Sequence, residues 1–316
     1  MKIIRYTSEE KSRWDSFVMA SKNATFLHCR DYMDYHSDRF DDFSLMCVDE
    51  SNNIVALLPA NRVDDVVYSH QGLTYGGWIT TIKSVNATTM LEIWQKMNEF
   101  LALEGVKKMI YKSVPHIYHR YPAEEDIYAI FRNKGAIYST QISTTLPLDE
   151  SRLRFNENAR RAIKHAMANN VKIEQSQEFG PYWLILSQML SEQHNTTPVH
   201  SLEEIELLHS RFPENIKLYV ARQDGEAVAG VVMFYTHTVA HAQYIAASPR
   251  GKELKVLPLL FDYIISNECG DCRWFDFGTS NEGGGLYLNE GLITQKSGMG
   301  GRGIAYNIFE LRIENL

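Results

Sequence analysis

The apolar and polar residues of this 316-residue chain follow the same order twice. Each pass begins with two apolar runs that flank a short polar turn, and a third apolar run follows. The runs are residues 43–48, 54–60 and 66–70 in the first pass, and 216–221, 227–233 and 239–248 in the second. Short apolar runs separated by turn residues such as Asp-Gly predict β-hairpins. The offset between the passes is constant, so that Ile54 aligns with Ala227 and Val66 aligns with Val239.

A helix and a further strand follow the third run in both passes. Residues 88–104 carry apolar side chains at helical spacing, among them Met90, Trp94 and Leu101, and Gly105 ends the pattern. Residues 256–267 form the second apolar helix. The remaining predicted elements are strands 107–114 and 273–278, a helix at 124–133, and closing strands at 136–146 and 305–312.

This order of elements predicts the fold class. A strand–helix–strand unit implies a right-handed parallel crossover, whereas the hairpins add antiparallel strands. We therefore expect an α/β (α+β) protein with two tandem domains, residues 1–150 and 151–316. Each domain would hold a mixed, mostly antiparallel sheet with a parallel strand–helix–strand core.

A basic segment, residues 151–171, lies between the two passes. It contains Arg152, Arg154, Arg160, Arg161 and Lys164 against a single acid, Glu157. The spacing predicts a helix with one basic side and one apolar side. Such a helix is either a linker with a solvated face or a patch for phosphate-bearing partners, such as the CoA pyrophosphate or a tRNA acceptor end. An amphipathic helix at 182–194 and a short acidic helix from Ser201 follow.

Composition narrows the class of protein. The chain is 44% hydrophobic and 22% charged, as is usual for globular proteins, and its net charge of −7 argues against general nucleic-acid binding. No apolar run approaches a membrane span, and the N-terminus turns polar after Ile4, so we expect a cytoplasmic protein without membrane insertion. The single pair Cys269 and Cys272 lacks the further ligands that zinc needs, so we expect a turn there and no metal.

The glycine-rich stretch 275–303 raises the question of a phosphate-binding loop. Such loops follow a strand, open a helix and place Lys-Ser/Thr directly after the glycine. Here Gly298–Gly303 precedes the last predicted strand, and Lys296 comes before these glycines. We instead expect a loop that folds closely over a cleft and presents polar side chains, namely Asn281, Glu282, Asn289 and Lys296.

The order of elements resembles the GNAT N-acyltransferase fold, and two copies joined by a basic helix resemble the Fem-type (FemABX-like) acyl and aminoacyl transferases. TFLHCRDYMDYHSDRF (25–40) and SHQGLTYGG (69–77) are similar to the N-terminal half of cytoplasmic bacterial members. RAIKHA (161–166) is similar to the basic linker helix of the family. The C-terminal FDFGTSNE…LNEGLITQKSGMGGR is similar to its "DFG…GL…K…G" signature.

The turn that binds CoA in typical GNAT proteins, Arg/Gln-x-x-Gly-x-Gly/Ala, is altered here. It reads Ser248-Pro-Arg-Gly-Lys-Glu-Leu-Lys255, with one glycine and one acid. The resemblance implies a donor-binding role for this turn, with the candidates Arg250, Gly251, Lys252 and Lys255. Fem-type members that use aminoacyl-tRNA typically lose the CoA turn, so the donor stays open. The coiled-coil arm that some of these members insert has no counterpart, because no heptad stretch occurs.

Several polar residues are candidates for the chemistry. Asp276 lies in an apolar strand, where it is either held by backbone donors or acts as a base. Lys296 matches the lysine that Fem-type enzymes place near the acyl donor or a substrate phosphate; the alternative is an exposed surface lysine. Glu282 could bind or deprotonate an amine. Tyr244 and His241 are either proton donors or core side chains whose polar atoms are satisfied. The candidates for substrate contacts are His70, Tyr75, His116, Arg120, Asn281, Asn289, Glu290 and Arg302.

Together these observations predict an N-acyltransferase that moves an acyl group from acyl-CoA (acetyl-CoA) to a primary amine, in a cleft between the halves. The second copy would hold the donor and the first the acceptor. The sequence contains no evident Ser-His-Asp or Cys-His motif context, such as a G-x-S-x-G elbow, so we expect direct attack by the amine. One alternative is an aminoacyl-tRNA-dependent peptidyltransferase that acts on a cell-wall-precursor amine in peptidoglycan cross-bridge synthesis. Another is a non-catalytic protein that binds small molecules.

Overall fold

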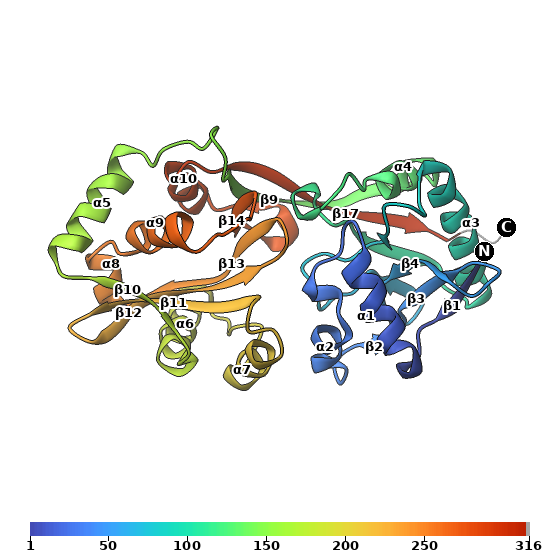
Figure 1. The fold of residues 1–316 in the computed structure, drawn as a ribbon, viewed down its shortest axis with the longest axis horizontal. Helices are drawn as coiled ribbons and strands as arrows, with labels where there is room; N and C mark the ends of the chain where they lie inside the picture. Colours follow the sequence, from blue (N-terminus) through green and yellow to red (C-terminus); the bar gives the residue numbers. More distant parts are fainter. Residues whose placement is uncertain (314–316) are drawn as a thin grey trace. The chain divides into compact units, whose positions relative to one another are not determined.

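The computed structural model describes residues 1–313, apart from the side chains of residues 193 and 194. The chain forms two compact units (Figure 1). Unit 1 contains Met1–Gln141, Gly283–Leu286 and the chain from Ala305 onwards; unit 2 contains Ile142–Glu282 and Tyr287–Ile304. The division is discontinuous, unlike the single boundary at residue 150 expected from the sequence. The reason is that β9 (Ala136–Pro147) and β17 (Arg302–Arg312) each run from one unit into the other.

Unit 1 has two groups of paired strands. The first has the order β1-β3-β4-β7, and the second has the order β17-β8-β6-β5-β2. The strands are β1 (Lys2–Arg5), β2 (Asp41–Asp42), β3 (Leu45–Val48), β4 (Ile54–Leu58), β5 (Asn61–Val63), β6 (Val66–Tyr68), β7 (Ile79–Thr80) and β8 (Lys108–Lys112). The helices are α1 (Lys11–Ala20), α2 (Arg30–Met33), α3 (Ala87–Leu103) and α4 (Glu125–Arg132). The sequence pattern predicts no element before residue 43, where the structure has β1, α1, α2 and β2.

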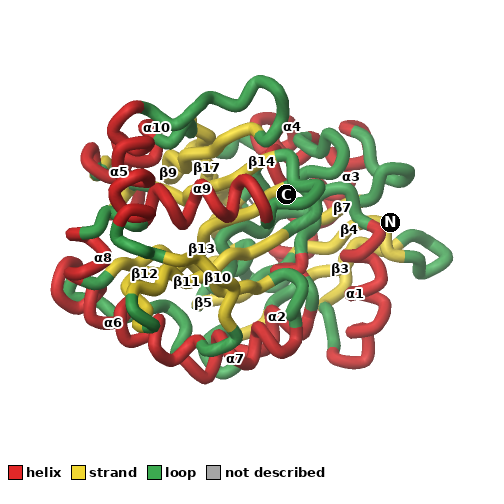
Figure 2. Tube along the Cα trace, turned by 60° about the vertical axis from the view of Figure 1, so that its left-hand side comes forward, coloured by secondary structure: helices red, strands yellow, loops and turns green. Residues whose placement is uncertain are grey.

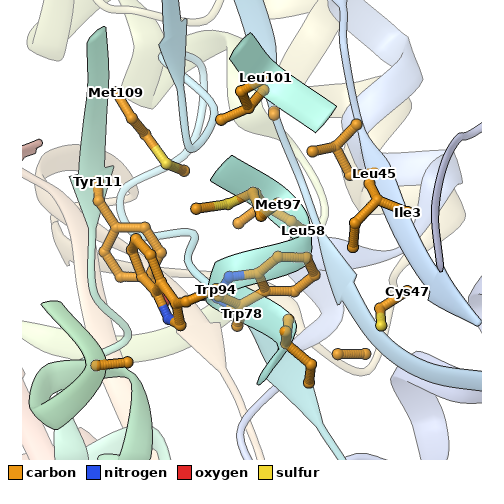
Figure 3. Close-up of a cluster of buried hydrophobic side chains, with 14 of the residues drawn as sticks. Ile3, Leu45, Cys47, Leu58, Trp78, Trp94, Met97, Leu101, Met109 and Tyr111 are labelled. Carbon is orange, nitrogen blue, oxygen red and sulfur yellow. Dashed lines mark hydrogen bonds between the residues drawn. The ribbon is translucent and has the colours of Figure 1, made fainter. Parts of the chain in front are cut away.

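Helix α3 supplies much of the core of unit 1. Asn86 caps its first turn by accepting a hydrogen bond from the Thr89 backbone N–H at 3.0 Å. Its stripe of Trp94, Met97 and Leu101 is fully buried against the strands (Figure 3). The helical periodicity of residues 88–104 therefore reflects real packing, and the helix prediction is confirmed.

Unit 2 is a layered structure. Its strands have the order β10-β11-β12-β13-β14-β9. Helices α6 (Phe179–His194) and α7 (Leu202–Arg211) cover one face, which we call the α6 face, while α9 (Leu257–Asn267) covers the other and α5 (Glu157–Ala168) packs on α9 (Figures 1 and 2). The strands are β10 (Lys172–Ser176), β11 (Ile216–Gln223), β12 (Glu226–Tyr235), β13 (Val239–Ala247) and β14 (Trp274–Thr279). Shorter elements are α8 (Pro249–Glu253), β15 (Asn281–Glu282), β16 (Tyr287–Leu288) and α10 (Glu290–Gly298).

The α9 face of unit 2 holds an apolar core. Phe275 and Phe277 of β14 are fully buried against Phe261 of α9, with ring centroids 5.8 and 5.1 Å from it. On the α6 face, Tyr182 lies directly over Gly230, where a Cβ would come within 2.5 Å of the tyrosine ring. Both faces of the sheet are thus covered, which explains the almost uniformly apolar strands β12 and β13.

The internal repeat is visible in the strand pairing. Val66 is the first residue of β6 and pairs in parallel with Lys108 of β8, and Val239 is the first residue of β13 and pairs in parallel with Trp274 of β14. Val66 and Val239, which the sequence offset aligns, therefore occupy equivalent positions in the two units. Of the residues that the structure describes, no helix is both long and apolar enough to cross a membrane.

Residues 290–298 correct one expectation. The glycine-rich sequence predicts a loop there, but these residues form helix α10. Asn289 caps this helix by accepting a hydrogen bond from the Leu292 backbone N–H at 3.0 Å. The cap and the intervening helix-forming residues outweigh the cost of two glycines at the helix ends.

Candidate functional site

The parallel strands β13 and β14 separate after a short contact. They pair at only three positions, and the last of these joins His241 to Asp276. Beyond this point β13 continues to Ala247, and no described strand pairs with it on its β14 side. Strand β14 also bulges here, because its register with β9 shifts between Asp276 and Thr279. The point of separation therefore gathers polar backbone and two ionisable side chains.

Asp276 is the centre of a hydrogen-bond network. Its side chain is fully buried and accepts hydrogen bonds from the Ser143 hydroxyl at 2.5 Å and from the Gly278 backbone N–H at 2.9 Å. Its other oxygen, Oδ2, lies 2.9 Å from Nδ1 of His241. A buried carboxylate with several donors is well satisfied. Of the two alternatives for Asp276, the structure shows a carboxylate held by hydrogen-bond donors. Its Oδ2 faces His241.

His241 is the neighbouring group with a free ring nitrogen. Its side chain is 13% exposed, and Asp276 fixes the tautomer that carries a proton on Nδ1. Within the described ranges, Nε2 of His241 takes part in no hydrogen bond. A histidine oriented by a carboxylate in this way can accept a proton at Nε2. The ring also lies beside Gly278, whose φ of +79° favours glycine.

Lys296 reaches the bulge from helix α10. It is 4% exposed, and its Nζ donates hydrogen bonds to the carbonyl oxygens of Gly278 and Thr279, both at 2.8 Å. Burial lowers the pKa of its ammonium group to about 8, and the charge of Asp276 opposes this shift. The lysine therefore holds the bulged end of β14 in place, next to Asp276.

Tyr244 lies further along β13 and is also buried. Its hydroxyl is 2.5 Å from Nδ1 of His200, and its ring packs edge-on against Trp183 of α6 at 5.2 Å. His200 was not among the residues singled out from the sequence. It lies in the connection between α6 and α7, and only folding brings it to a tyrosine that is distant in the chain.

The altered donor turn is partly occupied by its own contacts. Gly251 is buried against β12, and a Cβ at this position would lie 2.2 Å from the carbonyl oxygen of Val228. Its backbone N–H is bound by Ser248 Oγ at 3.1 Å. Arg250 contacts Gln223 and Glu253 at 2.9 and 2.7 Å. In contrast, Lys252 and Lys255 are exposed, and neither has an ion pair with any described residue.

The remaining candidates of the second half are mostly structural or exposed. Asn281 accepts a hydrogen bond from the Ile142 backbone N–H at 2.6 Å, and Asn289 is the cap of α10. Arg302 donates to the Gly301 carbonyl at 2.7 Å. Glu282 and Glu290 are exposed. The carboxylates of these two glutamates are therefore accessible to solvent.

Three of the four candidates of unit 1 have contacts of their own within that unit. His70 is buried and stacks on His36 at 5.3 Å, and burial lowers its pKa to about 3. Tyr75 is buried and donates a hydrogen bond to Thr25 at 3.3 Å. His116 is exposed, and Arg120 donates to the carbonyl oxygen of Met19 at 3.1 Å.

In unit 1 the chain itself fills the region where β6 and β8 end their pairing. Ser69 Oγ accepts a hydrogen bond from the Lys112 backbone N–H at 2.7 Å, and the Gly76 N–H donates to the Lys112 carbonyl at 3.2 Å. The Lys112 ammonium donates to the carbonyls of His70, Gln71 and Leu73. Burial lowers its pKa to about 8. Residues 69–77 are thus bound to the end of β8. In unit 2, no described strand pairs with β13 on its β14 side beyond the equivalent point.

We found no group of three or more possible metal ligands among the residues described. Comparison with curated proteins gave no match. Residues 152–284 match the family model of the acetyltransferase (GNAT) domain.

Solved structures match over the whole chain. FemX is 10% identical with a TM-score of 0.68, and the match covers 98% of this chain and 97% of that one. L-PGS from Bacillus licheniformis is 12% identical with a TM-score of 0.61, over 99% and 94%. A tandem GNAT protein from the clavulanic acid biosynthesis pathway is 10% identical with a TM-score of 0.54, over 100% and 99%. Residues 152–284 thus match the acetyltransferase (GNAT) domain, and the whole chain has the fold of FemX and of tandem GNAT proteins, as predicted.

Proposed function

We propose that this chain is an N-acyltransferase that binds its acyl donor in unit 2, where β13 and β14 separate. The observation that carries the proposal is the separation itself, with His241 and Asp276 at the last paired position. An extended donor arm can lie along the unpaired edge of β13, because strand edges offer backbone donors and acceptors. The reacting carbonyl would then lie near His241.

The contrast between the two units supports a single donor site. In unit 1 the equivalent position is closed by residues 69–77, which bind the backbone of Lys112. In unit 2, none of the described strands lies beside β13 on its β14 side beyond His241. The acceptor role of unit 1 stays a prediction from the sequence.

The proposed reaction is direct attack by a primary amine. Nε2 of His241 takes the proton of the attacking amine, and Asp276 holds the imidazole and stabilises its positive charge. The new N–C bond forms as the bond from the acyl carbon to the leaving group breaks. Tyr244 gives its phenolic proton to that leaving group. Asp276 itself is too deeply buried to contact substrate, so it is a positioning residue and not the base.

Acyl-CoA is the donor that a GNAT domain favours. The altered turn fits it in part: Lys252 and Lys255 are free to bind phosphate, whereas Arg250 already has partners and Gly251 is required by packing. A thermal-shift titration with acetyl-CoA and longer acyl-CoAs tests this fit. A donor at 100 times its Kd stabilises by about 2.7 kcal/mol, or roughly 5–10 °C for a domain of this size.

The matched variants are Lys252→Ala with Lys255→Ala, and Lys172→Ala as a control at an exposed lysine of β10. We expect the double variant to lose most of the shift and the control to keep it. No shift with any acyl-CoA or aminoacyl-tRNA would favour the non-catalytic binding protein. Native mass spectrometry of the purified chain would identify a donor or acceptor that stays bound.

A second candidate donor is aminoacyl-tRNA, because helix α5 has a basic face. Ala159, Ala162 and Ala166 are buried, whereas Arg160 and Lys164 are exposed and have no ion pair with the described part of the chain. Arg161 pairs with Glu157 at 2.7 Å. Such a face would bind phosphates with strong salt dependence. Salt-dependent retention of tRNA that is lost in Arg160→Ala/Lys164→Ala would select this donor, and retention unchanged by the variant would reject it.

A further inference from the structure

The face on which Tyr244 lies is set by a bulge in β13. Strand β12 pairs Val232 with Tyr244 but Met233 with Ala242, so Gln243 is an extra residue. Before the bulge, Ala240 and Ala242 pack in the core on the α9 face; after it, Ile245 packs there. The alternation is therefore shifted by one residue. Without the bulge, Tyr244 would point toward α9; with it, Tyr244 lies on the face opposite Ala242.

His241 lies on this same face. It neighbours Ala240 and Ala242 in the strand, and both of these point toward α9, so His241 points the other way. Tyr244 contacts Trp183 of α6, which confirms that this is the α6 face. The bulge thus places an imidazole and a phenol on one face of β13, at and just beyond the point where β14 departs.

His200 is held against Tyr244 by the start of α7. Ser201 and Glu204 form a capping box: Ser201 Oγ accepts from the Glu204 N–H at 3.2 Å, and Glu204 accepts from the Ser201 N–H at 2.8 Å. This fixes the backbone next to His200. The His200 backbone N–H lies 3.4 Å from the Tyr244 oxygen, and its Nδ1 lies 2.5 Å from the same atom. His200 is 4% exposed.

These contacts have a consequence for the phenol. When Nδ1 of His200 carries its proton, both the ring N–H and the backbone N–H donate to the Tyr244 oxygen. The phenolic proton then points away from His200. Two donors on one oxygen also stabilise the phenolate that forms when the proton leaves.

We propose that His200 is a positioning residue for the transfer reaction: it directs the Tyr244 hydroxyl and stabilises its phenolate, so that Tyr244 protonates the leaving group. This inference rests on the proposed function. During turnover the proton of Tyr244 goes to the leaving thiolate or alkoxide, and the phenolate regains a proton from solvent. The proton that His241 took from the amine is released to solvent, so no proton is gained or lost by the enzyme.

The test combines kinetics with a signal that needs no substrate. The variants are His200→Phe, His200→Gln, Tyr244→Phe and the double variant His200→Phe/Tyr244→Phe. His209→Phe is the matched control: His209 lies in α7, contacts a phenylalanine ring and bonds to Ile216 and Gln177, yet it is not near Tyr244 in the hydrogen-bond network. Release of CoA from acetyl-CoA with a panel of primary amines gives kcat and KM. Nitrogen NMR of the histidine rings reports the protonation of Nδ1 in His200.

General acid catalysis contributes about 10²–10⁴-fold, so we expect His200→Phe to lower kcat by roughly 10–100-fold with little change in KM. His200→Gln, which keeps an N–H donor, should restore part of that loss. The double variant should be no slower than Tyr244→Phe, because His200 acts through the phenol. Tyr244→Phe should also shift the Nδ1 resonance of His200, and His209→Phe should change neither kcat nor that resonance.

Three results would overturn the inference. The first is a wild-type rate in folded His200→Phe, and the second is losses that multiply in the double variant. The third is a His200 resonance that does not respond to Tyr244→Phe, which remains decisive if His200→Phe fails to fold. Wild-type protein that is inactive with every acyl donor would remove the proposed function, and the inference with it. An active wild type with an unaffected His200→Phe would remove the inference alone.

Discussion

Gly251 offers a direct test of whether the altered donor turn is shaped by packing or by a phosphate. The perturbation is Gly251→Ala. A methyl group there would lie 2.2 Å from the Val228 carbonyl oxygen and 3.3 Å from Cβ of Ala247. Ordinary contacts are about 3.4 Å or longer, so α8 or β12 must move by roughly 1 Å.

The expected cost follows from this overlap. Forcing an extra methyl group into a packed core typically costs about 1–3 kcal/mol. For a unit of this size each kcal/mol lowers Tm by roughly 2–4 °C, so we expect a fall of about 2–12 °C without any ligand. Gly180→Ala is the control, because Gly180 lies in helix α6 and a Cβ added there would lie 4.0 Å from the Leu202 side chain. That variant should be neutral or more stable by up to about 1 kcal/mol.

Differential scanning calorimetry of the ligand-free proteins measures both variants, and circular dichroism checks their helix content. Gly251→Ala with the Tm of the wild type but weaker acyl-CoA binding would refute the packing argument. The glycine would then serve the approach of a phosphate. A fall in Tm together with the stable Gly180→Ala control would assign Gly251 to the contact between α8 and β12.

Three further predictions concern β14 and α10. Asp276→Asn should lower the free energy of unfolding in urea by about 1–3 kcal/mol, because one of the three donors named above would then face an amide N–H. An unchanged midpoint of urea unfolding would contradict this network. Burial lowers the pKa of Lys296 from its ordinary value of 10.5 to about 8 in the folded protein. The unfolded chain therefore binds more protons between these two values, and stability rises with pH there by up to about 3 kcal/mol. Lys296→Met should flatten this rise between pH 8 and 10.5, and an identical pH profile would count against the burial of its charge. Asn289→Ala should cost about 1 kcal/mol through loss of the α10 cap, and calorimetry showing no loss would mean that the cap is dispensable.

Much of the fold could be predicted because it depends on local patterns. The alternation of apolar residues located the hairpins and the helices α3 and α9, and the constant offset of Val66 and Val239 revealed the repeat. The elements before residue 43 and helix α10 were missed. Their signals are weak, since most apolar residues of α1 are confined to its last four positions and α10 contains glycine, so tertiary packing decides them.

The candidate site could be predicted only in part. Asp276 and Lys296 were found because a carboxylate in an apolar strand and a lysine among glycines stand out in a sequence. Their roles could not be read there: Asp276 binds Ser143, His241 and a backbone N–H, and Lys296 binds two carbonyls. His200 carried no signal, because nothing in the residues around it indicates a partner on another strand.

The sequence by itself determined the order of the repeated strands and helices, and the resemblance that led to the fold, because periodicity and turn residues act over a few positions. Only the tertiary structure decided which polar groups meet. It showed the separation of β13 and β14, the bulge that turns Tyr244 to the face of His241, and the closed equivalent in unit 1. These features depend on strand register and on contacts between residues far apart in the chain, and a shift of one residue in register reverses which face a side chain occupies.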